Sequence, residues 1–247
     1  MPPPVAALMR GAGLALAVGL LSAAPALAQG ISLDLGEGQT LTLRSIQLIV
    51  VITLLGLVPG LAVMVTCFPF IVTVLSILRQ AIGLQQAPPN MLIVSLALFL
   101  TWFIMDPVLT EAWSTGVRPL SEGDLSLDAA IPAILAPFRL FMAARLDPET
   151  FQTLGELRNI GAVDPAAAPL SVLVPSFLLS EIQRAFEIGF LIYLPFLIID
   201  MVVAAVLMSM GMMMVPPAVV SMPFKRAVFV VADGWALVTG ALVRSYL

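Results

Sequence analysis

The chain has 247 residues, of which 60% are hydrophobic and 11% charged, and its mean hydropathy is +1.08. These values lie outside the range of soluble domains and are typical of an integral membrane protein. The formal net charge is −4 and the eleven Lys and Arg residues are scattered, which argues against a nucleic-acid partner. Histidine is absent and Cys67 is the only cysteine, so the chain lacks the ligands of most metal sites and the residues of most nucleophilic catalytic sites. We therefore expect no enzyme activity and no cofactor.

The first 28 residues have the three parts of a secretory signal peptide. Arg10 closes the positively charged region, residues 11–23 form an apolar core, and residues 26–28 read Ala-Leu-Ala, which fits the cleavage pattern. A mature chain would begin near Gln29 on the periplasmic side. The alternative is an uncleaved anchor helix, although an apolar core this short falls below the length that crosses a bilayer.

Four apolar segments follow, and their lengths predict helices in a membrane. Segment 46–65 is long enough for one crossing, and Pro59 predicts a kink inside it. Segment 91–105 ends before Asp106 and would cover only about 22 Å, so we expect this helix to be partly embedded in protein. The other two segments are 171–215 and 227–243.

These segments predict an all-α membrane protein with about four long, kinked hydrophobic helices in hairpins and a small helical insert. A cleaved signal peptide places the mature N-terminus in the periplasm. The positive charges of Arg79 and Lys225 favour the inner side for the loops that carry them, so both ends and the insert are expected in the periplasm. The expected parts are the signal peptide (1–28), an N-terminal segment with the first hairpin (29–105), the periplasmic insert (106–170) and the second hairpin with a methionine-rich loop (171–247).

The insert is the most polar part of the chain and holds nine of its fifteen acidic residues. Asp128 and the pair Asp147-Pro148 predict two helix starts, because Asp caps free amide groups and Pro suits the first helical position. An apolar stripe would form either the core of the insert or a contact between subunits of a periplasmic ring. Its candidates are Phe138, Leu140, Phe141 and Phe151.

Charged side chains recur inside the apolar segments, where they are costly. Glu181, Arg184 and Glu187 are three residues apart, so they lie on one helical face and Arg184 can pair in either direction. Charges at the centre of a membrane cost about 2.5–3.5 kcal/mol each, which requires partners. Asp200 and Asp233 are two further acids that we expect to fix helix packing. Three readings remain open for these charges: pairing within the chain, pairing between subunits, and proton relays in a proton-coupled carrier of small solutes.

Methionines gather near the end of the second apolar region. Met212, Met213 and Met214 precede Pro216 and Pro217, which predict a break in the helix because proline lacks an amide donor. At membrane depth, non-helical backbone is tolerated only where it is buried in protein or lines a cavity. Flexible thioethers at such a place could close a hole of variable width, whereas the plainer reading makes them gap-fillers in a core.

Five stretches resemble the family of flagellar FliP proteins and their injectisome relatives, which are components of type III export gates. Together they are far more specific than any one of them alone. They are FIVTVLSILRQAIGLQQAPPN (70–90), LALFLTWFIMDPV (96–108), PSFLLSEIQRAFEIGF (175–190), MMMVPPAVVSMPFK (212–225) and FVVADGW (229–235).

The resemblance implies a non-enzymatic subunit of the bacterial inner membrane, in the flagellar basal body. Such subunits form a pentameric ring that joins FliQ and FliR in a channel for unfolded flagellar subunits, with FliO assisting assembly and FlhA and FlhB completing the gate. It implies that Met212, Met213 and Met214 form a gasket that seals the channel. It also implies that Glu181 takes part in subunit association and that Arg184 and Lys225 make charge contacts between subunits. If the charges do pair between subunits, Glu187 is a further candidate for such a contact.

Overall fold

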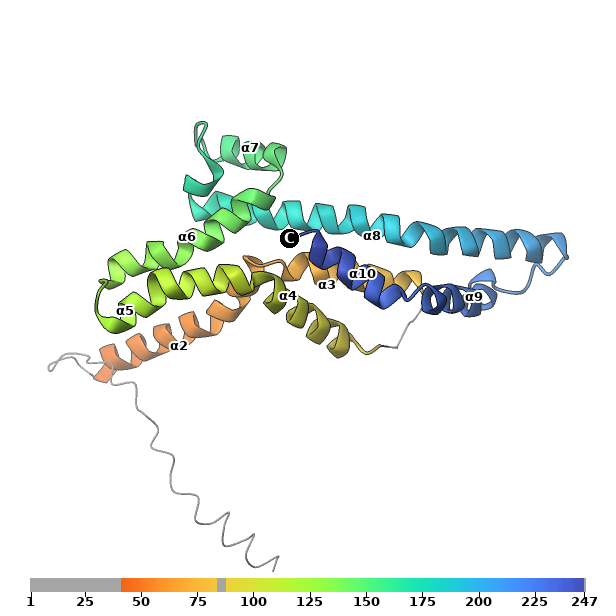
Figure 1. Cartoon of the computed structure of the whole chain (residues 1–247), viewed down its shortest axis with the longest axis horizontal. Helices are drawn as coiled ribbons and strands as arrows, with labels where there is room; N and C mark the ends of the chain where they lie inside the picture. The colour runs from red at the N-terminus through yellow and green to blue at the C-terminus, as the bar shows by residue number, and fades with distance from the viewer. Residues whose placement is uncertain (1–40, 84–87, 247) are drawn as a thin grey trace, which may run out of the picture. The chain divides into compact units, whose positions relative to one another are not determined.

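The computed structural model describes residues 41–83 and 88–246, and every regular element in these ranges is helical. The expected signal peptide and its cleavage site lie outside these ranges. The chain divides into two units, residues 1–53 and 54–247, and the packing described below lies within the second unit. The helices labelled in Figure 1 are α2 (Leu41–Met64), α3 (Phe68–Ala81), α4 (Asn90–Ala112), α5 (Arg118–Glu122), α6 (Leu127–Arg145), α7 (Pro148–Leu157), α8 (Leu170–Ser209), α9 (Pro217–Val231) and α10 (Gly234–Arg244). A π-helical turn, η1 (Trp113–Val117), joins α4 to α5, and a short 3-10 turn, η2 (Pro165–Ala167), precedes α8.

Four helical stretches within the described residues are long and apolar enough to cross a membrane, which confirms the all-α membrane class. They are Ser45–Met64, Asn90–Glu122, Leu127–Arg145 and Leu170–Ser209. Helices α9 and α10 together would make a fifth, although they are bent by 62° at the break between them. The 40 residues of α8 correspond to about 60 Å, roughly twice the thickness of the hydrocarbon core.

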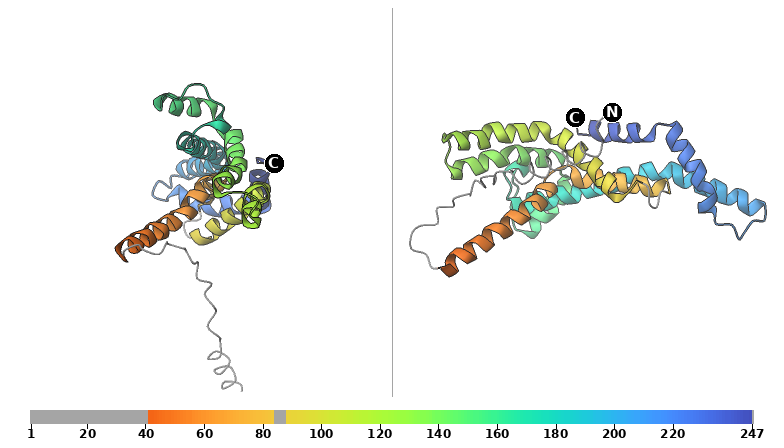
Figure 2. Two further views of the ribbon diagram at one scale, coloured as in Figure 1. Left: turned by 90° about the vertical axis from the view of Figure 1, so that its left-hand side faces the viewer. Right: turned by 90° about the horizontal axis from the view of Figure 1, so that it is seen from below.

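The expectation that the second apolar helix ends at Met105 is wrong. Helix α4 continues through Pro107 to Ala112, and η1 and α5 extend the helical stretch to Glu122. Pro107 is exposed, so the backbone carbonyl that loses its partner there is not trapped in a core. The stretch ends at Gly123, whose φ of +83° is the left-handed conformation that stops a helix. From there α6 returns antiparallel to the end of α4 (Figures 1 and 2).

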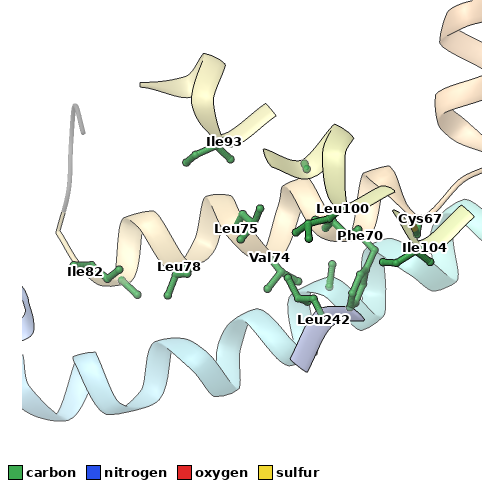
Figure 3. Packing of buried hydrophobic residues seen from close by; sticks show 14 of the residues in the cluster. Cys67, Phe70, Val74, Leu75, Leu78, Ile82, Ile93, Leu100, Ile104 and Leu242 are labelled. Carbon is green, nitrogen blue, oxygen red and sulfur yellow. The ribbon is translucent and has the colours of Figure 1, made fainter. Parts of the chain in front are cut away.

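Helix α3 is the centre of the main core, where it packs between α8 and α4 (Figure 3). Its fully buried residues recur every three or four positions and so share one broad face, while the remaining residues are half-buried apart from the exposed Gln80. In α8, Gly189 allows a close approach, because a Cβ atom there would lie 2.4 Å from Cδ1 of Ile77. The two views in Figure 2 agree that α3 lies beside α8. The fully buried members of this core in α3 are Phe70, Ile71, Val74, Leu75, Leu78 and Ala81.

Asp147 precedes helix α7, and the cap predicted there is confirmed. The Asp147 carboxylate accepts a hydrogen bond of 2.8 Å from the Thr150 amide, and Pro148 takes the first helical position. Hydrogen bonds from Thr150 hold the pKa of the Asp147 carboxyl below its usual range. The other predicted start is shifted, since Ser126 is the residue before α6 and Asp128 lies in the first turn without capping it.

Candidate functional site: the methionine loop and two charged clusters

The methionine-rich segment is a loop between α8 and α9. Helix α8 ends at Ser209, and Gly211 follows with a φ of +75°. The Met212 amide donates a hydrogen bond of 3.0 Å back to the Leu207 carbonyl, which gives one of the last carbonyl groups of the helix a partner. Gly211 rather than the proline pair therefore ends α8. Pro216 and Pro217 occupy the N-cap and the first position of α9, where a missing amide donor costs nothing.

The three consecutive methionines of this loop are open to the surroundings of the chain. Relative exposure rises from 43% at Met212 to 84% at Met213 and 98% at Met214. Such exposure of apolar thioethers rules out the plainer reading that they fill gaps in the core of this chain. Beside the loop lies an apolar groove of about 640 Å³ between α8 and α9, and Met212 contributes to its lining.

A charged cluster holds the two helices on either side of the loop together. The Asp200 carboxylate in α8 accepts hydrogen bonds of 2.5 Å from the Ser221 hydroxyl and from the Lys225 ammonium group in α9. Ser221 is buried, and the Lys225 side chain is only 7% exposed. Lys225, which the resemblance places between subunits, thus pairs within this chain. Ser221 was not a sequence candidate, although it precedes Lys225 by four residues and so shares its helix face.

This cluster should contribute measurably to stability. We expect Lys225→Met to lower the free energy of unfolding by about 1.5–3 kcal/mol, because the Asp200 carboxylate loses a charge-assisted hydrogen bond at a partly buried site. The measurement is unfolding of the purified chain in mixed detergent micelles as the fraction of SDS is raised. Arg226→Met is the matched control, since Arg226 is the exposed neighbour and makes no ion pair within the described residues. Equal losses for the two variants would contradict the expectation.

Asp233 does not pack helices against one another within the described residues. It is exposed, has φ 49° and ψ 48°, and makes no side-chain hydrogen bond or ion pair with them. It instead forms the turn at the bend between α9 and α10, a conformation that Asp tolerates better than most residues. The next residue, Gly234, is buried against Phe229, and a Cβ atom there would lie 2.2 Å from Cε2 of that ring.

A second charged cluster surrounds Glu181, whose side chain is completely buried in α8. Its carboxylate accepts from Nε of Arg145 over 3.3 Å and from the Tyr246 hydroxyl, and it lies 3.9 Å from Nη1 of Arg184. Arg145 also donates to the Ser245 carbonyl over 2.8 Å and lies over the Tyr246 ring, 3.9 Å from its centroid. The sequence pattern found Glu181 and Arg184 but missed Arg145 and Tyr246, which are 36 and 65 positions away from Glu181.

The remaining candidates differ in their surroundings. Glu187 is exposed and accepts a hydrogen bond from Gln183 on the same helix. Phe141 is half-buried against the core, where its ring contacts that of Phe177 with centroids 5.7 Å apart and stacks on Tyr246 with centroids 6.1 Å apart. Phe151 is half-buried and lines a hollow of about 1000 Å³ formed by α7 and the loop after it. Across the described residues, no group of three or more His, Cys, Asp or Glu side chains could hold a metal ion.

Comparison with known proteins assigns the chain to a family. The model of the FliP family matches residues 51–242. The chain belongs to the FliP family. It is 46% identical to the flagellar biosynthetic protein FliP of Caulobacter vibrioides, over 94% of this chain and 88% of that protein. It is 45% identical to the protein of the same name in Pectobacterium carotovorum, over 98% and 96% of the two chains, and 42% identical to that of Aquifex aeolicus, over 94% and 98%.

Membership of the FliP family makes this chain a component of the flagellar export apparatus. FliP is not a known enzyme family, and the partners that membership implies are other components of that apparatus. The long apolar helices agree with a flagellar protein of the inner membrane.

Proposed function

We propose that this chain is a channel-forming subunit of the flagellar type III export gate. It forms a pentameric ring with FliQ and FliR through which unfolded flagellar subunits cross the inner membrane, and FliO, FlhA and FlhB act with it. The observation that carries the proposal is the exposed run Met212–Met214 at the tip of a helix hairpin that the Asp200–Lys225 pair closes. Five such hairpins around an axis would bring fifteen thioethers into one narrow collar.

The length of α8 supports an assembly of several subunits. About half of its roughly 60 Å exceeds the hydrocarbon core, yet apolar residues stay exposed along the helix. Phe186 and Phe190 are among these residues and lie one helical turn apart. Lipid can cover only about half of a helix of this length, so we assign the rest of its exposed apolar surface to contact with other protein. Arg184 and Glu187 lie on the same stretch and are accessible, so we assign them to contacts between subunits, whereas Glu181 and Lys225 support the subunit from inside.

The segment 106–170 is proposed to lie on the periplasmic side. Helix α6 within it is apolar enough for a membrane, which is explained if neighbouring subunits of the ring cover its exposed face. Phe151, half-buried in its hollow, is a candidate for such a ring contact, while Phe141 acts within the subunit core.

The alternative of a proton-coupled carrier finds no support in the geometry. A relay requires acids that can take up and release protons along a path. Asp200 is tied to both Lys225 and Ser221, and Asp233 forms an exposed turn.

Replacement of all three methionines tests the proposed seal. We expect Met212→Ala, Met213→Ala and Met214→Ala, combined in cells that express the complete gate, to raise ion leakage several-fold, because alanine cannot fill the collar that the thioethers close. The measurement is the decay of membrane potential, with the level of assembled complex determined in parallel. Met208→Ala is the control, since Met208 is also exposed but lies on α8 outside the loop. Unchanged leakage from a fully assembled gate would refute the seal.

A further inference from the structure

The two residues that follow α10, Ser245 and Tyr246, pack against parts of the chain that are far apart in sequence. The Tyr246 ring meets Phe70 of α3 edge-on at 5.5 Å and stacks on Phe141 of α6 at 6.1 Å. Its hydroxyl donates to the buried carboxylate of Glu181 in α8. Three helices are therefore joined through one aromatic side chain.

The Ser245 carbonyl and the face of the Tyr246 ring are both held by Arg145. Its Nη1 atom donates to that carbonyl over 2.8 Å, and its guanidinium group lies 3.9 Å from the ring centroid. Arg145 in turn pairs with Glu181, so the hydroxyl, the carboxylate and the guanidinium group form one closed set of contacts. Removing any member leaves a polar group without its partner in a largely buried place.

Helix α10 contacts the core along one narrow face. Of its 11 residues Gly234 and Leu242 are buried, and Trp235, Val238 and Val243 are half-buried against the main core. It begins at Asp233 without a side-chain cap and at an angle of 62° to α9. A helix this short depends on tertiary contacts rather than on its own hydrogen bonds. The contacts of Ser245 and Tyr246 at its far end therefore add a second anchor to this narrow face.

We propose that Tyr246 is a positioning residue that acts through Glu181 and Arg145 as a releasable latch for α10. With the latch closed, α10 stays docked on the main core; with the latch open, α10 swings about the turn at Asp233. Docking covers part of the core cluster in which Cys67 is fully buried together with Phe70 and Leu242 (Figure 3). Tyr246 packs against this cluster, so release of α10 uncovers the only thiol of the chain.

The test uses Tyr246→Phe in the purified full chain in detergent, because this change removes only the hydroxyl group. We expect amide hydrogen exchange in α10 and labelling of Cys67 by N-ethylmaleimide to become roughly ten- to a hundredfold faster, the effect of losing a hydrogen bond to a charged group. Tyr193→Phe is the matched control, since Tyr193 is the other tyrosine, is half-buried against the same core and makes no side-chain hydrogen bond within the described residues.

Two further results separate a latch from a general loss of stability. Exchange in α7 should stay unchanged in Tyr246→Phe, and the double variant with Glu181→Leu should label no faster than Glu181→Leu alone. Unchanged labelling in Tyr246→Phe, faster exchange throughout the chain, or additive effects in the double variant would each overturn the proposal. None of these measurements needs an assembled gate, so they are independent of the proposed export function.

Discussion

Glu181→Ala is expected to lower the free energy of unfolding by about 3–5 kcal/mol, the largest effect of any single change considered for this chain. Glu181 is completely buried, and its carboxylate accepts hydrogen bonds from both Arg145 and the Tyr246 hydroxyl. Alanine would leave a guanidinium group in a mostly buried place without its counter-charge. The loss should appear as a lower SDS fraction at the midpoint of unfolding of the purified chain.

Two companion variants make this result interpretable. Glu187→Ala removes an exposed carboxylate from the same helix, six residues further on, and we expect a change within about 0.5 kcal/mol. Glu181→Gln keeps an acceptor for the Tyr246 hydroxyl and should recover part of the loss. A loss for Glu181→Ala no larger than that for Glu187→Ala would show that the buried cluster does not stabilise the fold.

Gly116→Ala is expected to force apart the hairpin formed by the end of α4, η1 and α6. A Cβ atom at this position would lie 2.3 Å from Cγ1 of Ile134 and 2.9 Å from its backbone nitrogen. A side chain can rotate away from such a contact, but the backbone of α6 can yield only if the helix moves. We expect destabilisation of about 1–3 kcal/mol, as for other overpacked interiors, seen as a lower Tm in detergent.

Gly60→Ala is the matched control for this substitution. No atom lies within 4 Å of a Cβ at Gly60 in the exposed helix α2, so alanine should be neutral or should stabilise by up to about 1 kcal/mol. If Gly116→Ala were as stable as the parent chain, the close approach of η1 to α6 would be wrong.

The length and apolar character of the helices could be predicted from the sequence, whereas several of their ends could not. The pair Asp106-Pro107 has the composition of a stop, yet α4 passes through it, because both residues lie on an exposed side where a missing hydrogen bond is tolerated. At the methionine loop the sequence predicted the helix break at the proline pair, whereas Gly211, which is in the left-handed conformation, ends α8. Glycine stops depend on a backbone angle that composition alone does not reveal.

The charged clusters show where sequence reasoning ends. Helical spacing linked Glu181 to Arg184, because residues three apart share a face. No periodicity links Glu181 to Tyr246 or Asp200 to Ser221, since these pairs form only when separate helices pack together. Asp233 carried the same signal as Asp200, a lone acid in an apolar segment, but it belongs to a turn. Sequence therefore identified which charges need an explanation, and tertiary packing decided their partners.

The exposed thioethers of the loop also carry a chemical liability. Oxidants convert methionine to its sulfoxide, which is polar and chiral, and attack follows accessibility. Met214 is 98% exposed and Met213 is 84% exposed, so both are open to attack before the chain meets its partners. We therefore expect the unassembled subunit to be sensitive to peroxide at the same side chains that we propose for the collar, and rapid assembly or enzymatic reduction of the sulfoxide would preserve it.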